Sequence, residues 1–280
     1  MDQLLLPFEL LFMQQAFVIT LLISLPMALL SCYLVLKGWS LFGDAISHAV
    51  LPGVVIAYVI NIPLAIGAFI AGMICALSSA YVSDRSRIKE DTALGIVFAT
   101  MFGLGIVLHV AVSSDVHLDI ILFGDMLGVT WSDIGQTLVI ALIVSAFLLI
   151  WRKDLLVAAF DPQHARAISL PMVFLHYGLL SAIALMAVAA LSAVGIILAI
   201  AFLVTPGAIA FLITRQFHLM MLVSALVATS STIIGIYISF FIDSAPAPTI
   251  VLVMTLLFII AFLYGAKTMD PLDPAQGSSK

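Results

Sequence analysis

Asp44 and His48 are the two residues whose types and spacing best suit metal chemistry. They lie in the run GDAISHAVLPG, residues 43–53, which is otherwise apolar or small. Residues four apart share one face of a helix, so a carboxylate oxygen and an imidazole nitrogen would lie side by side. Such a pair of ligands suits Mn²⁺, Fe²⁺ or Zn²⁺. A structural interpretation also stays open, in which Asp44 caps a helix and His48 bonds a neighbouring backbone carbonyl.

The composition indicates what surrounds these two residues. Of the 280 residues, 64% are hydrophobic and 9% are charged, and the mean hydropathy is +1.29. The apolar runs reach the roughly 20 residues of a membrane-spanning helix, and they are continuous rather than alternating as in a β-barrel. We therefore expect an all-α integral membrane protein, a polytopic bundle of eight to nine transmembrane helices. A carboxylate inside such a bundle costs ~2.5–3.5 kcal/mol, so Asp44 needs a partner, a wet cavity or a function.

Nine candidate spans follow one another within a single transmembrane domain, residues 1–280, which ends in a short polar tail, residues 266–280. The spans cover residues 11–36, 42–60, 63–83, 92–112, 134–151, 171–191, 194–214, 218–242 and 248–265. If the loop SDRSRIKED, residues 83–91, is cytoplasmic, alternation places all ten Lys and Arg residues on the cytoplasmic side. This asymmetry predicts an outer N-terminus and a cytoplasmic C-terminus.

Other residues of the spans and outer loops are secondary candidates. An outer loop and the short segment after it supply possible metal-attracting groups, which are otherwise solvated loop residues: Asp115, His117, Asp119 and Asp125. In the seventh span, Pro206 and Gly207 predict a kink that could act as a gate, although both residue types are ordinary in membrane helices.

The longest polar connection, residues 152–171, carries a helix signal. Asp161 can cap a helix, Pro162 suits its first position, and Ala165 and Ala167 keep the surface small enough for close approach. Two interpretations remain open from these residues alone: a short amphipathic helix on the inner leaflet, or a docking element for a cytoplasmic partner.

The sequence contains no motif for chemistry of its own. A phosphate-binding loop of the form GxxxxGK[ST] is absent, and the nearest run, GAKT at residues 265–268, lacks the glycine directly before the lysine. GxSxG and HExxH arrangements are absent as well. We therefore expect passage of a solute rather than an enzymatic reaction.

Four runs carry a resemblance to a known family. They are LVLKGWSLFGDAISHAVLPGVVIAYVI, AAFDPQHARAISLP, AVGIILAIAFLVTPGAIAFLITRQF and APAPTIVLVMTLLF, spread between residues 34 and 258. Together they resemble the membrane permease subunit of bacterial ABC importers for manganese, zinc or iron. The full run LFGDAISHAVLPG is far more specific than an Asp and a His four residues apart, so the resemblance favours Asp44 and His48 as metal ligands.

The resemblance also implies an assembly. Family members are homodimers or close heterodimers of helical bundles, of the type II ABC importer kind, in the bacterial cytoplasmic (inner) membrane. A cytoplasmic ATPase pair uses ATP, an extracytoplasmic binding protein delivers the metal, and no nucleic acid is involved. The resemblance makes residues 158–170 the segment that couples to the ATPase, with these contact candidates: Phe160, Asp161, Pro162, His164, Ala165, Arg166 and Ala167.

The expected cargo is Mn²⁺ or Fe²⁺, because no cysteine-rich or histidine-rich loop points to zinc. Three alternatives remain open: a zinc importer of the same family, a proton-coupled secondary transporter with Asp44 and His48 as a proton relay, and an ABC permease for siderophore or cobalamin. An aromatic content of only 10% favours a bare ion over a large chelate.

Overall fold

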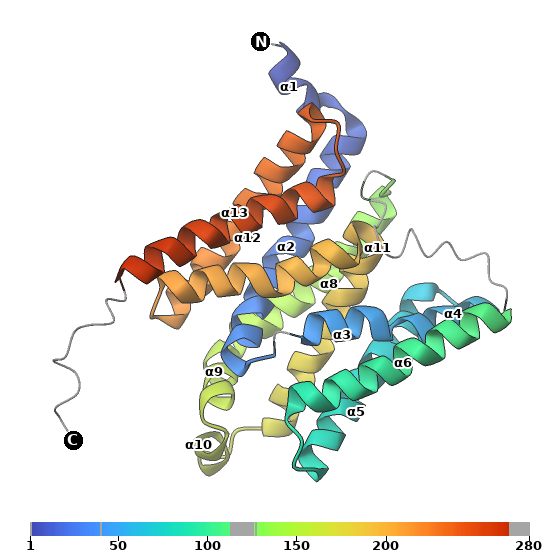
Figure 1. Cartoon of the computed structure of the whole chain (residues 1–280), viewed down its shortest axis with the longest axis vertical. Coiled ribbons are helices and arrows are strands. Elements are labelled where there is room, and N and C mark those ends of the chain that lie inside the picture. Colours follow the sequence, from blue (N-terminus) through green and yellow to red (C-terminus); the bar gives the residue numbers. More distant parts are fainter. Residues whose placement is uncertain (1, 40, 113–125, 127, 269–280) are drawn as a thin grey trace.

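A computed structural model describes residues 2–39, 41–112, 126 and 128–268, and within these ranges every regular element is a helix. Figure 1 shows the helices gathered in one bundle. In chain order they are α1 (Asp2–Glu9), α2 (Leu11–Lys37), α3 (Phe42–Ala49), α4 (Leu51–Val59), α5 (Leu64–Arg85), α6 (Glu90–Val112), α8 (Trp131–Ile150), α9 (Arg152–Phe160), α10 (Pro162–Ala167), α11 (Met172–Ile213), α12 (Phe217–Phe241) and α13 (Pro246–Thr268).

Helices dominate because backbone groups in an apolar surrounding must find partners within their own segment. Hydroxyl side chains inside the bundle follow the same rule and donate to carbonyls one turn earlier. The Thr20 hydroxyl donates to the carbonyl of Ala16 at 2.7 Å, and the Thr232 hydroxyl donates to that of Ala228 at 2.8 Å. Both threonines are fully buried. These two threonine hydroxyls are therefore satisfied within their own helices.

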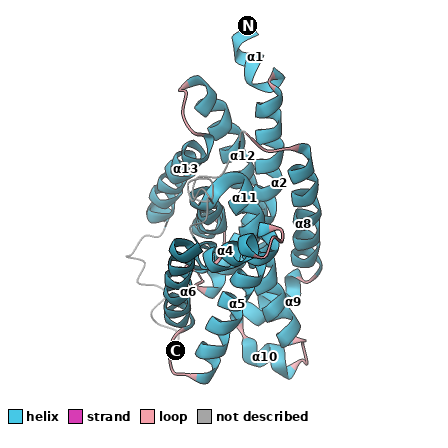
Figure 2. Ribbon diagram, turned by 90° about the vertical axis from the view of Figure 1, so that its right-hand side faces the viewer, coloured by secondary structure: helices cyan, strands magenta, loops and turns pink. Residues whose placement is uncertain are grey.

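Helix α2 is the central element against which the second half of the chain packs. The Ser31 hydroxyl donates to the Val204 carbonyl of α11 at 3.0 Å and accepts from the Gly207 N–H at 2.9 Å. The Ser224 hydroxyl of α12 donates to the Ala28 carbonyl of α2 at 2.7 Å. Figure 2 shows α2, α11 and α12 in the middle of the bundle, with α8 and α13 on opposite flanks.

Helix α11 runs from one end of the bundle to the other and back. Gly195, with φ 79° and ψ 170°, is the one residue inside α11 with non-helical dihedral angles, and its positive φ is a conformation that glycine adopts without a Cβ clash. Figure 1 shows the sharp bend between the yellow first half and the orange second half. Near the start of α11, Phe174 packs on Trp151, and directly after its end Phe217 packs on Tyr33.

Both ends of α11 thus lie at the end of the bundle where α2 and α8 stop. We call this the basic end, because Lys37 and Arg152 lie there. Among the described residues, eight helical segments are long and apolar enough to cross a membrane, counting α3 with α4 as one and α11 as one. Counting the returning α11 as two crossings gives the nine predicted spans, so the expected bundle of eight to nine transmembrane helices is confirmed.

The structure has a break in the seventh predicted span that the sequence did not predict, at Gly195. Pro206 and Gly207 lie further along α11 with helical dihedral angles, and a kink there stays a prediction. Gly207 serves close packing, since a Cβ there would lie 2.5 Å from the Ser31 hydroxyl oxygen. A gating role for Pro206 and Gly207 stays a prediction.

The crossing of α4 and α5 depends on two glycines in mutual contact. A Cβ on Gly53 would lie 2.1 Å from the Gly67 carbonyl oxygen, and a Cβ on Gly67 would lie 2.2 Å from the Gly53 carbonyl oxygen. Because the obstacle is backbone, a rotamer change cannot relieve it. Small residues of this kind let membrane helices approach closely.

We expect Gly53→Ala to destabilise the protein by ~1–3 kcal/mol, the usual cost of overpacking. The measurement is the thermal unfolding midpoint of the purified protein in detergent. Gly135→Ala is the matched control, because a Cβ at Gly135 in α8 meets nothing within 4 Å and alanine favours the helix. An unfolding midpoint equal for Gly53→Ala and Gly135→Ala would contradict the close crossing.

Candidate functional site

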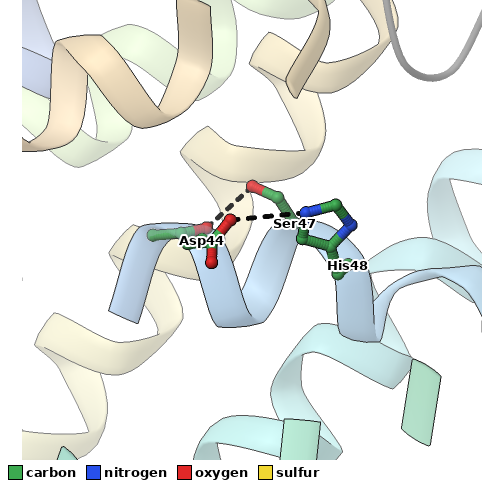
Figure 3. Close-up of polar contacts among 4 residues, drawn as sticks. Asp44, Ser47 and His48 are labelled. Carbon is green, nitrogen blue, oxygen red and sulfur yellow. Dashed lines mark hydrogen bonds and ion pairs between the residues drawn. The ribbon is translucent and has the colours of Figure 1, made fainter. Parts of the chain in front are cut away.

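The Asp44 and His48 pair lies on α3, a helix of eight residues between the end of α2 and α4. The Oδ1 atom of Asp44 lies 3.3 Å from the Nε2 atom of His48, as the spacing of four residues predicts. Figure 3 shows the two side chains on one face of α3, with the Ser47 side chain beside them. The Ser47 hydroxyl donates to the Gly43 carbonyl at 2.7 Å and is therefore already satisfied within α3.

Local sequence explains why the helix is interrupted just after the pair. Pro52, in the first turn of α4, has no backbone N–H, so it cannot donate to the carbonyl of His48 four residues earlier. The turn around Val50 separates α3 from α4, although Val50 keeps helical angles of φ −66° and ψ −27°. The pair therefore lies on the last complete turns before an interruption in the helix.

Three neighbouring helices hold α3 in place by close contacts. A Cβ on Gly43 would lie 2.8 Å from the Cδ1 atom of Leu203 in α11, and a Cβ on Gly72 of α5 would lie 3.2 Å from the Cγ2 atom of Ile46. On α6, Phe98 and Phe102 flank the His48 ring, with centroid distances of 5.8 Å and 5.3 Å. The imidazole thus has aromatic packing on one side and the Asp44 carboxylate on the other.

The pair remains accessible within a single chain. The side chains of His48 and Asp44 are 26% and 41% exposed, while their neighbours Ala45, Ile46 and Ser47 are buried. Among the described residues, no group of three or more His, Cys, Asp or Glu side chains is arranged to hold a metal ion. One chain therefore offers one oxygen and one nitrogen ligand here, on a face that is open to further ligands.

Asp44 does not cap α3, although the sequence left that structural role open. The N-terminal cap position of α3 is Leu41, and no side chain caps this helix. Asp44 lies in the first turn, where a negative charge interacts favourably with the helix dipole. The secondary candidates Asp115, His117, Asp119 and Asp125 lie outside the described residues.

The segment predicted to dock a cytoplasmic partner forms two short helices, α9 and α10, at the basic end. The Asp161 carboxylate caps α10 as predicted, accepting from the backbone N–H groups of Gln163 at 3.1 Å and His164 at 2.9 Å. Pro162 occupies the first turn, also as predicted.

The outward surface of this segment mixes two large apolar residues with polar ones. Phe160 is 65% exposed and Ile168 is 50% exposed, although both are apolar. The polar and small residues between them are exposed as well: Asp161, Pro162, His164, Arg166 and Ala167. Ala165 is the exception, since it is fully buried, so it anchors α10 to the bundle rather than offering a surface for close approach.

Sequence reasoning missed the aromatic neighbours of the site. Phe98 and Phe102 are four residues apart, so the sequence places them on one face of the predicted span 92–112. Nothing in the sequence says that this face meets His48, because helix pairing is a long-range property. The apolar flank of the imidazole is therefore visible only in the structure.

Comparison with known proteins shows similarity along nearly the whole chain. The chain is 52% identical over 258 residues to a chelated iron transport system membrane protein of Yersinia pestis, covering 92% of this chain and 87% of that protein. It is 46% identical over 261 residues to a manganese transport system membrane protein of Synechocystis, covering 93% and 85%.

Solved structures agree with this similarity. The complex of PsaBC from Streptococcus pneumoniae with a Fab matches with a TM-score of 0.80 and 34% identity, covering 90% of this chain and 91% of that one. An inward-facing metal-chelate type ABC transporter matches with a TM-score of 0.70 at 15% identity, which shows the fold alone. The sequence model of the ABC 3 transport family matches residues 9–265, and the chain therefore belongs to that family.

Proposed function

We propose that this chain is the membrane permease of an ATP-driven importer that moves Mn²⁺ or Fe²⁺ into the cytoplasm. The observation that carries the proposal is the pairing of Asp44 and His48, whose ligand atoms lie 3.3 Å apart on a half-exposed face of α3. Oxygen and nitrogen ligands suit these ions. Relatives named as iron and manganese transport proteins support the same cargo.

A second copy of the chain completes the site in this proposal. Two ligands from one chain are fewer than Mn²⁺ or Fe²⁺ takes, whereas two copies related by a twofold axis supply two carboxylates and two imidazoles. A C2 dimer is the commonest oligomer and uses the same surface patch of each subunit, so residues near its axis face their own copies. The carboxylates offset the charge of the ion, and the number and geometry of the ligands set selectivity, because raw affinity would favour zinc over manganese.

The energy and the cargo come from partners. A cytoplasmic ABC ATPase pair binds α9 and α10, and an extracytoplasmic binding protein delivers the metal at the opposite end of the bundle. ATP binding closes the ATPase pair and rearranges the helices, so that the ion passes from the binding protein to Asp44 and His48 and then to the cytoplasm. The permease domain, residues 1–280, has its coupling segment near residues 158–170.

The chain lies in the bacterial cytoplasmic membrane in this account, with its C-terminus in the cytoplasm. Lys37 and Arg152 lie at the basic end of the bundle, next to the coupling segment. Cytoplasmic loops carry an excess of Lys and Arg, so the basic end faces the cytoplasm.

We expect Asp44→Asn to lower the cellular content of the transported metal by at least about tenfold, since even outer-shell partners of metal ligands contribute 10–100-fold to affinity. The measurement is the multi-element metal content of metal-starved cells that depend on this importer, at matched membrane expression. Asp243→Asn is the control, because Asp243 is an exposed acid with φ 51°, a conformation that Asn also adopts.

A selective fall in manganese or iron supports the proposal, and a fall in zinc alone would change the cargo to zinc. Unchanged levels of all three metals would remove the metal-ligand role of Asp44. Uptake that persists after loss of the ATPase indicates a proton-coupled transporter instead. Uptake of chelated but not free metal indicates a siderophore or cobalamin permease.

We expect Phe160→Ala to weaken binding of the ATPase by ~2 kcal/mol, about 30-fold. The ATPase would bury the exposed Phe160 ring, and an aromatic side chain buried at an interface is a typical hot spot. The measurement is the amount of ATPase that copurifies with the tagged permease. Ile88→Ala is the control, because Ile88 is an apolar residue that is 39% exposed in a different connection, between α5 and α6. Equal recovery of the ATPase with Phe160→Ala and Ile88→Ala would argue against this docking surface.

A further inference from the structure

The connection between α2 and α3 is held by a buried tryptophan. Gly38 ends α2 with φ 70°, and the Trp39 N–H donates to the Leu34 carbonyl at 2.9 Å. This turn places the Trp39 side chain inside the protein, where it is 3% exposed. Trp39 lies three residues before Phe42, the first residue of the helix that carries Asp44 and His48.

Four helices contribute side chains around the Trp39 ring. Phe42 of α3 stacks on it with a centroid distance of 4.8 Å, and the Lys37 Nζ atom of α2 lies 3.8 Å from its centroid. The indole Nε1–H donates to the Glu90 Oε2 atom of α6 at 2.9 Å. His176 of α11 packs edge-on with a centroid distance of 5.7 Å.

The hydrogen bond to Glu90 orients the Trp39 ring. Indole has a single donor, and here its acceptor is a carboxylate, which makes a shorter and stronger hydrogen bond than a neutral acceptor does. Glu90 is the first residue of α6, the helix whose Phe98 and Phe102 flank His48. Trp39 therefore contacts both the helix that carries the metal pair, α3, by stacking, and the helix that flanks His48, α6, by its hydrogen bond.

His176 connects the same ring to the coupling segment. It lies in the second turn of α11, five residues after Pro171, the cap residue of that helix. The connection from α10 to α11 is short, and the Leu170 N–H donates to the Ala165 carbonyl at 3.0 Å. Contacts therefore follow one another from α10 to the start of α11, to the edge of the Trp39 ring and to α3.

We propose that Trp39 is a positioning residue that passes movement of the coupling segment to the metal pair on α3, with Glu90 fixing the orientation of its ring. This role rests on the proposed function, because it requires an ATPase at α10 and an ion at Asp44 and His48. Trp39 itself contacts neither the ion nor the ATPase. A transporter that lacks the Trp39 ring contacts still hydrolyses ATP and still moves the metal, but it moves fewer ions per ATP hydrolysed.

The test is the number of Mn²⁺ ions moved per ATP hydrolysed by the whole transporter, purified through a tag on this chain and reconstituted in liposomes with its Mn²⁺-loaded binding protein. We expect Trp39→Phe, which keeps a ring but removes the Nε1–H donor, to lower this ratio about 2- to 30-fold while ATP hydrolysis continues, the range expected of coupling residues. Glu90→Gln keeps an acceptor oxygen, so its ratio should fall less than that of Trp39→Phe.

Trp131→Phe is the matched control, because Trp131 is 57% exposed at the start of α8. A ratio unchanged in Trp39→Phe would overturn the proposal, and so would a proportional loss of uptake and hydrolysis with a lowered unfolding midpoint, which indicates a structural role only. Failure of the proposed function is a different result: the native transporter then shows no ATP-dependent uptake of either Mn²⁺ or Fe²⁺, and Asp44→Asn has no effect.

Discussion

The contact between Asp44 and His48 inside a bundle of apolar helices is the constraint on which the rest of the structure depends. A carboxylate among apolar helices is costly unless it has a partner or reaches a wet cavity. His48 supplies the partner at 3.3 Å, and the half-exposed face of α3 supplies the access. The glycines at positions 43 and 72 let α11 and α5 press closely on α3, so the pair is held by packing on one side and open on the other.

The returning helix α11 joins this site to the basic end of the bundle. Its second half contacts α2 through Ser31 and packs against α3 at Gly43, while its first turns lie next to α8 and the connection from α10. Gly195 makes the return possible, because its dihedral angles are those that residues with a Cβ rarely adopt. One element therefore touches both the proposed coupling segment and the helix that carries the metal pair.

Much of this arrangement follows from the sequence, since helix spans and caps are local properties. The apolar runs give the spans, the spacing of four residues places Asp44 beside His48, and the Asp161 cap of α10 is as predicted. Contacts between distant segments were not predictable in this way. The non-helical residue of α11 is Gly195, which no pattern in the sequence singled out, whereas Pro206 and Gly207 keep helical dihedral angles. The burial of Ala165 and the Phe98 and Phe102 flank of His48 depend equally on which helices meet.

The most direct test of the account is the nitrogen hyperfine coupling of Mn²⁺ bound to the purified permease dimer, measured by electron–nuclear double resonance with ¹⁵N-labelled histidine. An ion held by the pairs of two protomers predicts coupling to histidine nitrogen that disappears in His48→Gln. Bound Mn²⁺ without histidine coupling, or coupling that persists in His48→Gln, would contradict the assignment of this site.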